Sequence, residues 1–468
     1  MNSIKQNYIF LLFIAAFLIR FVSIDQSLWL DEATTAVTVA KYSIAEILTK
    51  FSPTDFHPPL YYLVMDLWTQ IFGISEFSLR VPSVIFSIMT GLILMKIFRG
   101  SDPIFLFNPL IIYYSQEARM YSMATFLVAT SFYFFIKMTD EKNKSTHNID
   151  LYLFLLFAIL SFYTFYATVF FVATAFLYLV LIKRVGPSLI LTVIFSFAIA
   201  LISPLLQTQF TNSRQALLQV VNWSTVLGTI NLKSLLLIPI KFTSGRISFE
   251  PKILYYGVSV LWLLFYTFST VVGLLLSKKT LRTLFKMDFK KIIKSKFFIF
   301  SFFLITPLFL GIIFSISSPL LQYFRFQYLI IFLSLLVAYS CSIIPNQKFK
   351  KIIYSTIVSG SLAFSLIYLF VPQFHREDWK SLTKAAAQEN LPIYMITSSS
   401  DPLKYYAPNL NTKSLKEINS SSNLPSPIIV IPYTADIHGV NYAEVLNNKD
   451  KIKITVRNFR GLQYEVWR

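Results

Sequence analysis

Long apolar runs recur along the whole of this chain of 468 residues, and they constrain its fold more than any other feature. In hydrocarbon, every backbone N–H and C=O group must find a partner inside the protein. A helix of about 20 apolar residues meets this condition across the thickness of a bilayer. Only 14% of the residues are charged, whereas soluble chains have about 25%. The sequence therefore predicts a polytopic α-helical membrane protein.

By this length criterion we expect about eleven membrane-spanning helices. They lie near residues 7–24, 81–98, 103–115, 121–138, 150–164, 167–184, 187–206, 253–276, 297–316, 324–344 and 352–371. The first run has no site of small residues behind it at which a signal peptidase could cut. We therefore interpret it as an uncleaved first helix.

The positions of the cations matter more than the net charge of +19, which would suggest a nucleic-acid partner in a soluble chain. If Lys5 lies in the cytoplasm, most basic loops lie there too, including the cluster at 278–296. The positive-inside rule then predicts a cytoplasmic N-terminus and an extracytoplasmic C-terminus. Such loops contact anionic membrane lipids, and we expect no nucleic-acid partner.

The predicted helices divide the chain into a membrane domain, residues 1–371, and a small extracytoplasmic domain, residues 372–468. In the second domain, residues 391–397, 427–433 and 452–456 are typical of strands, and residues 379–388 of a helix. We expect a small α/β domain, near the lower size limit for independent stability. Cys341 is the single cysteine, so no intrachain disulfide stabilises it.

The first outer loop, residues 25–80, has the pattern of a folded segment. Apolar residues recur at helical spacing over residues 37–48 and again over 60–72, where Gly73 ends the pattern. Two outer-face amphipathic helices lying in the membrane interface would explain both stripes. Packing against protein alone is the alternative. A second long outer loop is expected at 207–252.

Two adjacent acids, Asp31 and Glu32, lie between apolar neighbours just after the first span. A carboxylate beside a low-dielectric wall has a raised pKa unless a cation or hydrogen bonds offset the burial. Such a group can act as a general base toward an incoming hydroxyl. The spacing alone leaves open an acid at a helix N-terminus that faces water.

More polar side chains are expected at the same membrane face, where ionisable groups are costly and are therefore functional candidates. They are His57, Tyr61, Arg80, Glu117, Arg119, Tyr121 and Arg325. Arginines provide permanently charged, bidentate contacts to phosphate. Glu117 and Arg119 could instead pair with each other, and Arg20 and Arg325 could extend toward the interface.

The order and spacing of four motifs resembles the GT-C membrane glycosyltransferases of family 39, which include protein mannosyltransferases and aminoarabinose transferases. The motifs are Trp29-Leu-Asp-Glu-Ala, His57-Pro-Pro-Leu-Tyr-Tyr, Glu76-Phe-Ser-Leu-Arg-Val-Pro-Ser and Tyr114-Ser-Gln-Glu-Ala-Arg-Met-Tyr. Further along, three segments are similar to the bacterial members, namely Tyr163-Thr-Phe-Tyr-Ala, Tyr323-Phe-Arg-Phe-Gln-Tyr-Leu and Arg376-Glu-Asp-Trp-Lys. The resemblance therefore implies a bacterial plasma membrane. The chain departs from the bacterial pattern at Phe165, Phe324 and Phe326.

The resemblance implies a GT-C-like fold and inverting transfer of a sugar from a polyprenyl-phosphate carrier to an acceptor hydroxyl at the outer face. The acceptor would be a protein, a lipid or a glycan. Asp31 is implied as the catalytic base, with Glu117 and Glu32 as further acids of the site. The substrate-binding candidates are His57, Tyr61, Arg80, Arg119, Tyr121 and Arg325. This mechanism requires no metal or other cofactor beyond the lipid-linked donor.

Two other classes stay open on the sequence. A transporter or lipid-carrier flippase without transferase activity also has many helices, and a non-catalytic scaffold could share the fold. Transporters typically show repeated halves and polar residues at the membrane midplane. In this chain the polar groups are expected at one face, and no repeat is apparent. From its position alone, the C-terminal domain would gate the site or recognise the acceptor.

Overall fold

The computed structural model describes residues 2–140, 147–276, 288–421 and 423–468. Most of these residues form a bundle of apolar helices. Within these residues, seven helices are long and apolar enough to cross a membrane. They are α5 (Glu76–Ile97), α8 (Tyr121–Thr139), α11 (Val185–Gln219), α14 (Lys252–Leu276), α17 (Lys296–Ser315), η4 with α18 (Tyr323–Ser342), and α19 (Gln347–Phe370). The predicted polytopic membrane fold is confirmed.

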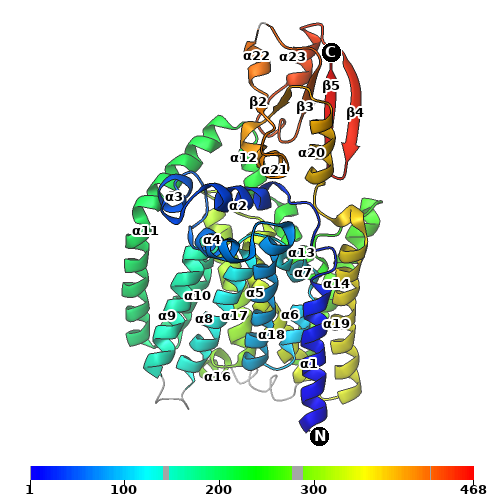
Figure 1. Cartoon of the computed structure of the whole chain (residues 1–468). Helices are drawn as coiled ribbons and strands as arrows, with labels where there is room; N and C mark the ends of the chain where they lie inside the picture. The colour runs from blue at the N-terminus through cyan, green and yellow to red at the C-terminus, as the bar shows by residue number, and fades with distance from the viewer. Residues whose placement is uncertain (1, 141–146, 277–287, 422) are drawn as a thin grey trace.

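Shorter apolar helices complete the bundle. They are α1 (Asn2–Ile19), α9 (His147–Thr164), and α10 (Val169–Leu181) with the preceding 3-10 turn η3 (Tyr166–Thr168). The chain begins at the end of the bundle that lies away from the C-terminal sheet (Figure 1). Part of the basic cluster at 278–296, and Lys142 and Lys144 of an earlier basic loop, lie outside the described residues.

The single helix expected at 103–115 is wrong, because the segment forms two short helices, α6 (Ser101–Leu106) and α7 (Pro109–Ser115). Helix α6 ends at Leu106, and Asn108 caps α7 with a side chain that accepts hydrogen bonds from the N–H groups of Leu110 and Ile111. Pro109 takes the first position of α7, where a missing N–H is tolerated. Every residue of both helices is buried inside the bundle.

The second outer loop is more helical than expected. Helix α11 does not end at residue 206 but continues to Gln219, and α12 (Trp223–Leu227) and α13 (Leu232–Ser244) follow it. In Figure 1, α11 runs along one side of the bundle and rises to α12, below the sheet. The polar extension of α11 is held by tertiary contacts, since the side chains of Gln209 and Asn212 donate hydrogen bonds to carbonyl groups of residues 52–57.

The first outer loop forms helices that cross the sheet-bearing end of the bundle (Figure 1). They are α2 (Leu30–Lys41), α3 (Ile44–Glu46), the π-helical turn η1 (Ile47–Phe51) and α4 (Leu60–Phe72). Helix α4 buries Tyr61 and Met65, whereas Ile71 is 76% exposed and Phe72 is 56% exposed. Large exposed apolar side chains on one face suit a helix that meets lipid.

The C-terminal region, residues 372–468, contains a five-stranded mixed sheet with strand order β2-β1-β3-β5-β4. The strands are β1 (Ile393–Met395), β2 (Thr412–Ser414), β3 (Ile428–Ile431), β4 (Lys453–Phe459) and β5 (Leu462–Trp467). Strand β1 pairs in parallel with β2 and β3, and β5 runs antiparallel to β3 and β4. The expected small α/β fold is confirmed, although the sequence pattern missed β2 and β5.

Helix α20 (Trp379–Gln388) packs on this sheet, with Trp379 and Leu382 fully buried against strands β1 and β3. Its bounds are those expected from the sequence. Three shorter helices, α21 (Asp401–Tyr406), α22 (Glu417–Ser420) and α23 (Tyr442–Asn447), connect the strands. The C-terminal region therefore has a core of its own, and α21 lies against α2 of the first outer loop.

Candidate functional site

The two adjacent acids at the start of α2 point in different directions. Consecutive helical residues are about 100° apart around the helix axis, because 3.6 residues make one turn. Glu32 is fully buried, whereas Asp31 is partly exposed. Within the described part of the chain, no group donates a hydrogen bond to the Asp31 carboxylate. The resemblance grouped the two residues, and the fold gives them different surroundings.

Glu32 forms a bidentate ion pair with Arg80 of α5. Nε and Nη2 of Arg80 lie 2.8 and 2.6 Å from the two carboxylate oxygens, and both side chains are fully buried. The remaining N–H groups of Arg80 donate to the carbonyl oxygens of Ile24, Gln26 and Ser27. All five donors of the guanidinium are therefore used. Arg80, a substrate-binding candidate, has none left for a phosphate and instead fixes the chain before α2.

Glu117 pairs with Arg376, from the segment between α19 and α20, and not with Arg119. Nη2 of Arg376 lies 2.8 Å from Oε2 of Glu117, and its Nε lies 3.4 Å from Oε2 of Glu32. Both side chains are buried. We call Glu32, Arg80, Glu117 and Arg376 the buried cluster. It holds two carboxylates and two guanidiniums, so their charges balance.

The pKa values of the two carboxyl groups in the buried cluster are shifted in opposite directions. Burial alone would raise the pKa of Glu32, but Arg80, Arg376 and the N–H of Ala118 outweigh it, and the pKa lies below its usual value. Burial raises the pKa of Glu117, and Arg376 only partly offsets the effect. The expectation that cations offset burial therefore holds for one acid and not for the other.

Arg119 connects Asp31 to a second group of polar side chains. Nη1 of Arg119 donates to the hydroxyl of Tyr62 (2.9 Å) and to the backbone carbonyl of Asp31 (3.4 Å), and its Nη2 lies 3.3 Å from Nδ1 of His57. Asp55, which the sequence motifs did not single out, accepts a hydrogen bond from Tyr62 and lies 3.3 Å from His57. We call Asp55, His57, Tyr62 and Arg119 the bridging group.

The other members of the bridging group lower the pKa of Asp55. Its burial would raise the pKa, but His57, Arg119 and the Tyr62 hydroxyl lower the pKa to about 2. The backbone of this segment is held in turn by Gln209 of α11, which donates to the carbonyl groups of Ser52 and His57. The extension of α11 that sequence patterning missed thus helps to position the bridging group.

Two arginines at the edge of the site keep donors free. Arg246 follows Gly245 at the end of α13, is exposed, and uses Nη1 to donate to the hydroxyl of Tyr113 at 2.8 Å. Arg325 of η4 (Tyr323–Leu329) uses Nη1 on the carbonyl of Leu227. Within the described residues, their other N–H groups make no hydrogen bonds, although the two guanidiniums lie over the rings of Tyr113 and Phe324. We call Asp31, Arg246 and Arg325 the open rim.

Asp31 and Arg246 lie near the same carboxyl group, that of Glu377. Burial raises the pKa of Glu377; Tyr433 and Arg246 work against this, and Asp31 adds to it. Oε1 of Glu377 accepts a hydrogen bond from the Tyr433 hydroxyl at 3.1 Å. One cation and one acid of the open rim, Arg246 and Asp31, therefore act on the same buried carboxyl. No sequence motif marked Arg246, whose only signal was a cation beside a glycine in an outer loop.

Three buried polar atoms of the candidate residues have no hydrogen-bond partner in the described chain. They are the hydroxyl of Tyr61, Oε1 of Glu117 and Nε of Arg119. Burial raises the pKa of the Tyr61 hydroxyl, and the charges of Arg119, Glu32 and Glu117 also act on this pKa. Buried polar atoms normally have a partner in the protein, in water or in a ligand. These three atoms can therefore receive water or polar groups of a substrate.

The candidate Tyr121 and the nearby cation Arg20 lie in different surroundings. The ring of Tyr121 makes edge contacts with the rings of Tyr114, Phe165 and Phe324. Arg20 is fully buried and donates to Ser87 and to the carbonyl of Leu106. The sequence left open that Arg20 extends to the interface, and these acceptors instead hold it between helices.

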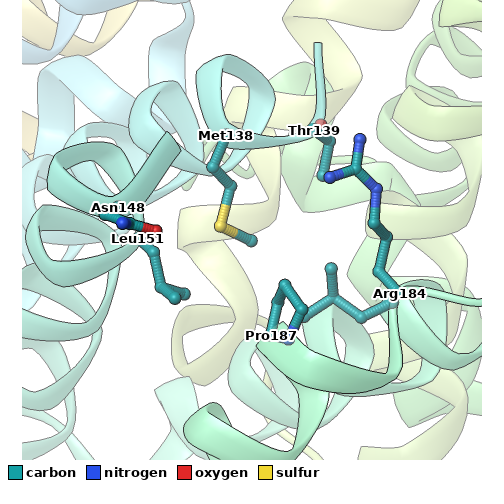
Figure 2. Close-up of a pocket in the computed structure, with 7 residues that line it drawn as sticks. Met138, Thr139, Asn148, Leu151, Arg184 and Pro187 are labelled. Atoms are coloured by element: carbon teal, nitrogen blue, oxygen red, sulfur yellow. The ribbon is translucent and has the colours of Figure 1, made fainter. Parts of the chain in front are cut away.

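A pocket at the other end of the bundle lies away from these groups. Figure 2 shows it between the end of α8, the start of α9 and the start of α11, with Arg184 beside Thr139. Because α8 starts at Tyr121 in the site and ends at Thr139 in the pocket, the whole helix separates them. Among the described residues, no group of three or more His, Cys, Asp or Glu side chains is placed to hold a metal ion.

Comparison with solved structures relates the fold to two structures of ArnT. ArnT from Cupriavidus metallidurans in the apo state matches with a TM-score of 0.59 and 10% identity, over 99% of this chain and 98% of that chain. A structure of ArnT from the same organism bound to undecaprenyl phosphate aligns with a TM-score of 0.42 and 12% identity, over 98% of both chains.

No protein-family model and no curated protein matches this chain. The chain has an ArnT-like GT-C fold. At 10% identity the likeness carries the fold alone, and it does not extend to the narrower assignment to family 39. The chain is an integral membrane protein with several candidate spans.

Proposed function

We propose that this protein is an inverting glycosyltransferase that moves a sugar from a polyprenyl-phosphate carrier to an acceptor hydroxyl. The ArnT-like fold suggests a transferase that uses a sugar linked to such a carrier. The geometry of Asp31 carries the rest of the proposal. Of the acids at this end of the bundle, it combines partial exposure with a carboxylate that no described group engages, beside the cations Arg119 and Arg246.

In the proposed reaction, the acceptor hydroxyl attacks the anomeric carbon of the donor sugar from the side of Asp31. The new bond forms between the acceptor oxygen and that carbon, and the bond from the carbon to the phosphate oxygen breaks. The electron pair leaves with polyprenyl phosphate, and the proton of the hydroxyl passes to the Asp31 carboxylate. A positioned base of this kind contributes about 10²- to 10⁴-fold to a rate.

The leaving phosphate needs positive charge where its own charge grows. Arg246 and Arg325 supply it in this proposal, because both keep guanidinium donors free. Arginine offers paired donors to phosphate oxygens, and such preorganised donors stabilise a developing anion. Arg119 lies directly behind Asp31 and, with His57, Tyr61 and Tyr121, shapes the wall of the site.

We further propose that the site faces the extracytoplasmic side, with the N-terminus in the cytoplasm. The site and the C-terminal region lie at one end of the bundle and the N-terminus at the other. The distribution of Lys and Arg in the loops supports this orientation. In this arrangement, residues 1–371 form the transferase domain in the membrane, and the C-terminal region covers the site from outside.

The test is an assay of purified protein in nanodiscs with a panel of polyprenyl-phosphate sugars and a mixture of cell-envelope acceptors. Release of free polyprenyl phosphate is followed for the wild type, Asp31→Asn and Asp25→Asn. We expect wild-type release with at least one donor and a loss of about 10²- to 10⁴-fold in Asp31→Asn. Asp25 is exposed and six residues away, so the same substitution there is a matched control and should leave release unchanged.

Near-normal release by Asp31→Asn would remove Asp31 as the base. A wild type that binds the carrier lipids but releases none of them with any acceptor would overturn the transferase proposal. Movement of the intact lipid-linked sugar across the vesicle membrane would then assign the chain to the flippase class.

A further inference from the structure

Arg376 belongs to two parts of the molecule at once. It lies between the end of α19 at Phe370 and the start of α20 at Trp379, where the chain passes into the C-terminal region. Its backbone carbonyl accepts a hydrogen bond from Nε of Arg460, in the turn between β4 and β5, at 2.7 Å. Its side chain points the other way, into the buried cluster, and is 4% exposed as a residue.

In the described residues, Arg376 is the one cation that contacts both Glu32 and Glu117. Arg80 cannot replace it, because all five of its donors are engaged. The guanidinium of Arg376 also lies 4.4 Å from the ring centroid of Tyr113. Removal of Arg376 would therefore leave one uncompensated negative charge in the buried cluster.

The contacts of Glu117 and Glu32 extend to the groups of the proposed reaction. The residue after Glu117, Ala118, donates its N–H to Oε1 of Glu32 at 2.8 Å. The next residue, Arg119, donates to the backbone carbonyl of Asp31. Because Asp31 directly precedes Glu32 on the first turn of α2, a shift of either carboxylate would move the proposed base.

The C-terminal region also contacts the start of α2 directly. The N–H of Leu28 donates to the hydroxyl of Tyr406 at 2.8 Å, and the N–H of Lys380 donates to the Ser27 hydroxyl at 3.1 Å. Thr34 of α2 donates to Asp401 of α21 at 2.9 Å. The segment that carries Asp31 is thus held between the bundle and the C-terminal region.

We propose that Arg376 is a positioning residue that couples docking of the C-terminal region to the assembly of the transferase site. Its guanidinium joins the Glu32 and Glu117 carboxylates and thereby fixes α2 and the segment of Arg119. The site is complete only when the C-terminal region is docked and delivers this side chain. The expected loss of turnover rests on the proposed function. The expected effect on docking of the C-terminal region rests on the contacts alone.

The first experiment compares Arg376→Ala and Arg376→Lys with Arg457→Ala in the full-length protein. Arg457 lies on β4 of the same sheet and pairs with Glu389 at the surface, so it is a matched control. We expect Arg376→Ala to lower kcat by about 100-fold, the effect of a misplacement near 1 Å, with little change in the donor KM. Arg376→Lys should keep an intermediate kcat, since one ammonium lacks the planar fork that reaches both carboxylates.

Millimolar guanidinium chloride should restore part of the kcat of Arg376→Ala and leave Asp31→Asn inactive. Wild-type kcat in a folded Arg376→Ala protein would overturn the inference. A large rise in the donor KM with unchanged kcat would also overturn it, because Arg376 would then bind the donor. If Arg376→Ala does not fold, Arg376→Ala with Glu117→Gln removes both charges. We expect this pair to fold with low kcat, and wild-type kcat would contradict the positioning role.

Hydrogen exchange tests the coupling without any transferase activity. Arg376→Ala should speed amide exchange both at residues 28–41 and in α20, whereas Arg457→Ala should change neither of these segments. If the wild type shows no transferase activity but this exchange pattern appears, the proposed function fails and the coupling stands. If the wild type is active and Arg376→Ala leaves exchange unchanged at residues 28–41, the coupling fails and the proposed function stands.

Discussion

The Glu32–Arg80 pair of the buried cluster and the open rim use the same residue types but differ in how completely their hydrogen-bonding groups are satisfied. In the cluster, Arg80 uses all five donors and has no exposed surface. At the rim, Arg246 is exposed and uses one hydroxyl partner. The acids differ in the same way, with Glu32 engaged and Asp31 free. The difference teaches that side chains with all their hydrogen bonds made hold the site together. Side chains with unused donors or acceptors are available to bind substrate.

The largest effect on stability is expected from Arg80→Met. Removal of one partner of a buried ion pair leaves an uncompensated charge and costs about 3–5 kcal/mol of unfolding free energy. Denaturant or thermal unfolding in detergent measures this change. Arg214→Met is the control, because Arg214 is exposed and lies over the ring of Phe210. Equal stability of the two variants would contradict the structural role given to Arg80 and the buried cluster.

A smaller effect, on substrate binding, is expected from Arg246→Met. A hydrogen bond that involves a charged group contributes about 1.5–3 kcal/mol, so loss of one phosphate contact should raise the donor KM by roughly 10- to 100-fold. The melting temperature should stay unchanged, because the side chain is exposed. Steady-state kinetics with the donor identified for the wild type gives the KM. A lower melting temperature with an unchanged KM would place Arg246 with the structural residues.

The smallest effect is a pH dependence that belongs to the bridging group. The pKa of Asp55 is lowered to about 2, from an ordinary value of 3.8. A carboxyl with a lowered pKa stabilises the fold above its unfolded pKa, and this contribution is lost as the pH falls from about 4 to about 2. The full contribution is about 2 kcal/mol. The difference in unfolding free energy between wild type and Asp55→Asn should shrink as the pH falls from about 5 to about 2, and a constant difference would contradict the assignment.

The sequence predicted the architecture more fully than the site. Hydropathy identified the helical bundle, and the pattern over residues 60–72 predicted α4 together with its end at Gly73. The helical pattern over residues 379–388 predicted the bounds of α20 correctly. The break at Asn108 and the extension of α11 to Gln219 were missed. Both depend on contacts between distant segments, such as the hydrogen bond from Asn108 to the carbonyl of Phe242.

For the site, motif spacing brought Asp31, Glu32, Arg80, Glu117 and Arg119 to the same end of the bundle. It did not assign their partners. Glu117 could have paired with the nearby Arg119, yet its partner is Arg376, 259 residues away along the chain. Arg80 was a substrate-binding candidate on charge alone, and only its five acceptors show that its donors are engaged. Arg246 and Asp55 carried no motif signal.

The sequence by itself determined that the chain is a membrane bundle with acids and arginines gathered toward one end, because hydrophobic periodicity and charge are local properties. Only the tertiary structure decided which of these groups are engaged and which stay open. That distinction depends on burial and on hydrogen-bond partners supplied by remote segments. Asp31 and Glu32 are neighbours in the chain with the same chemical group, and the fold alone leaves one carboxylate open and places the other between two arginines.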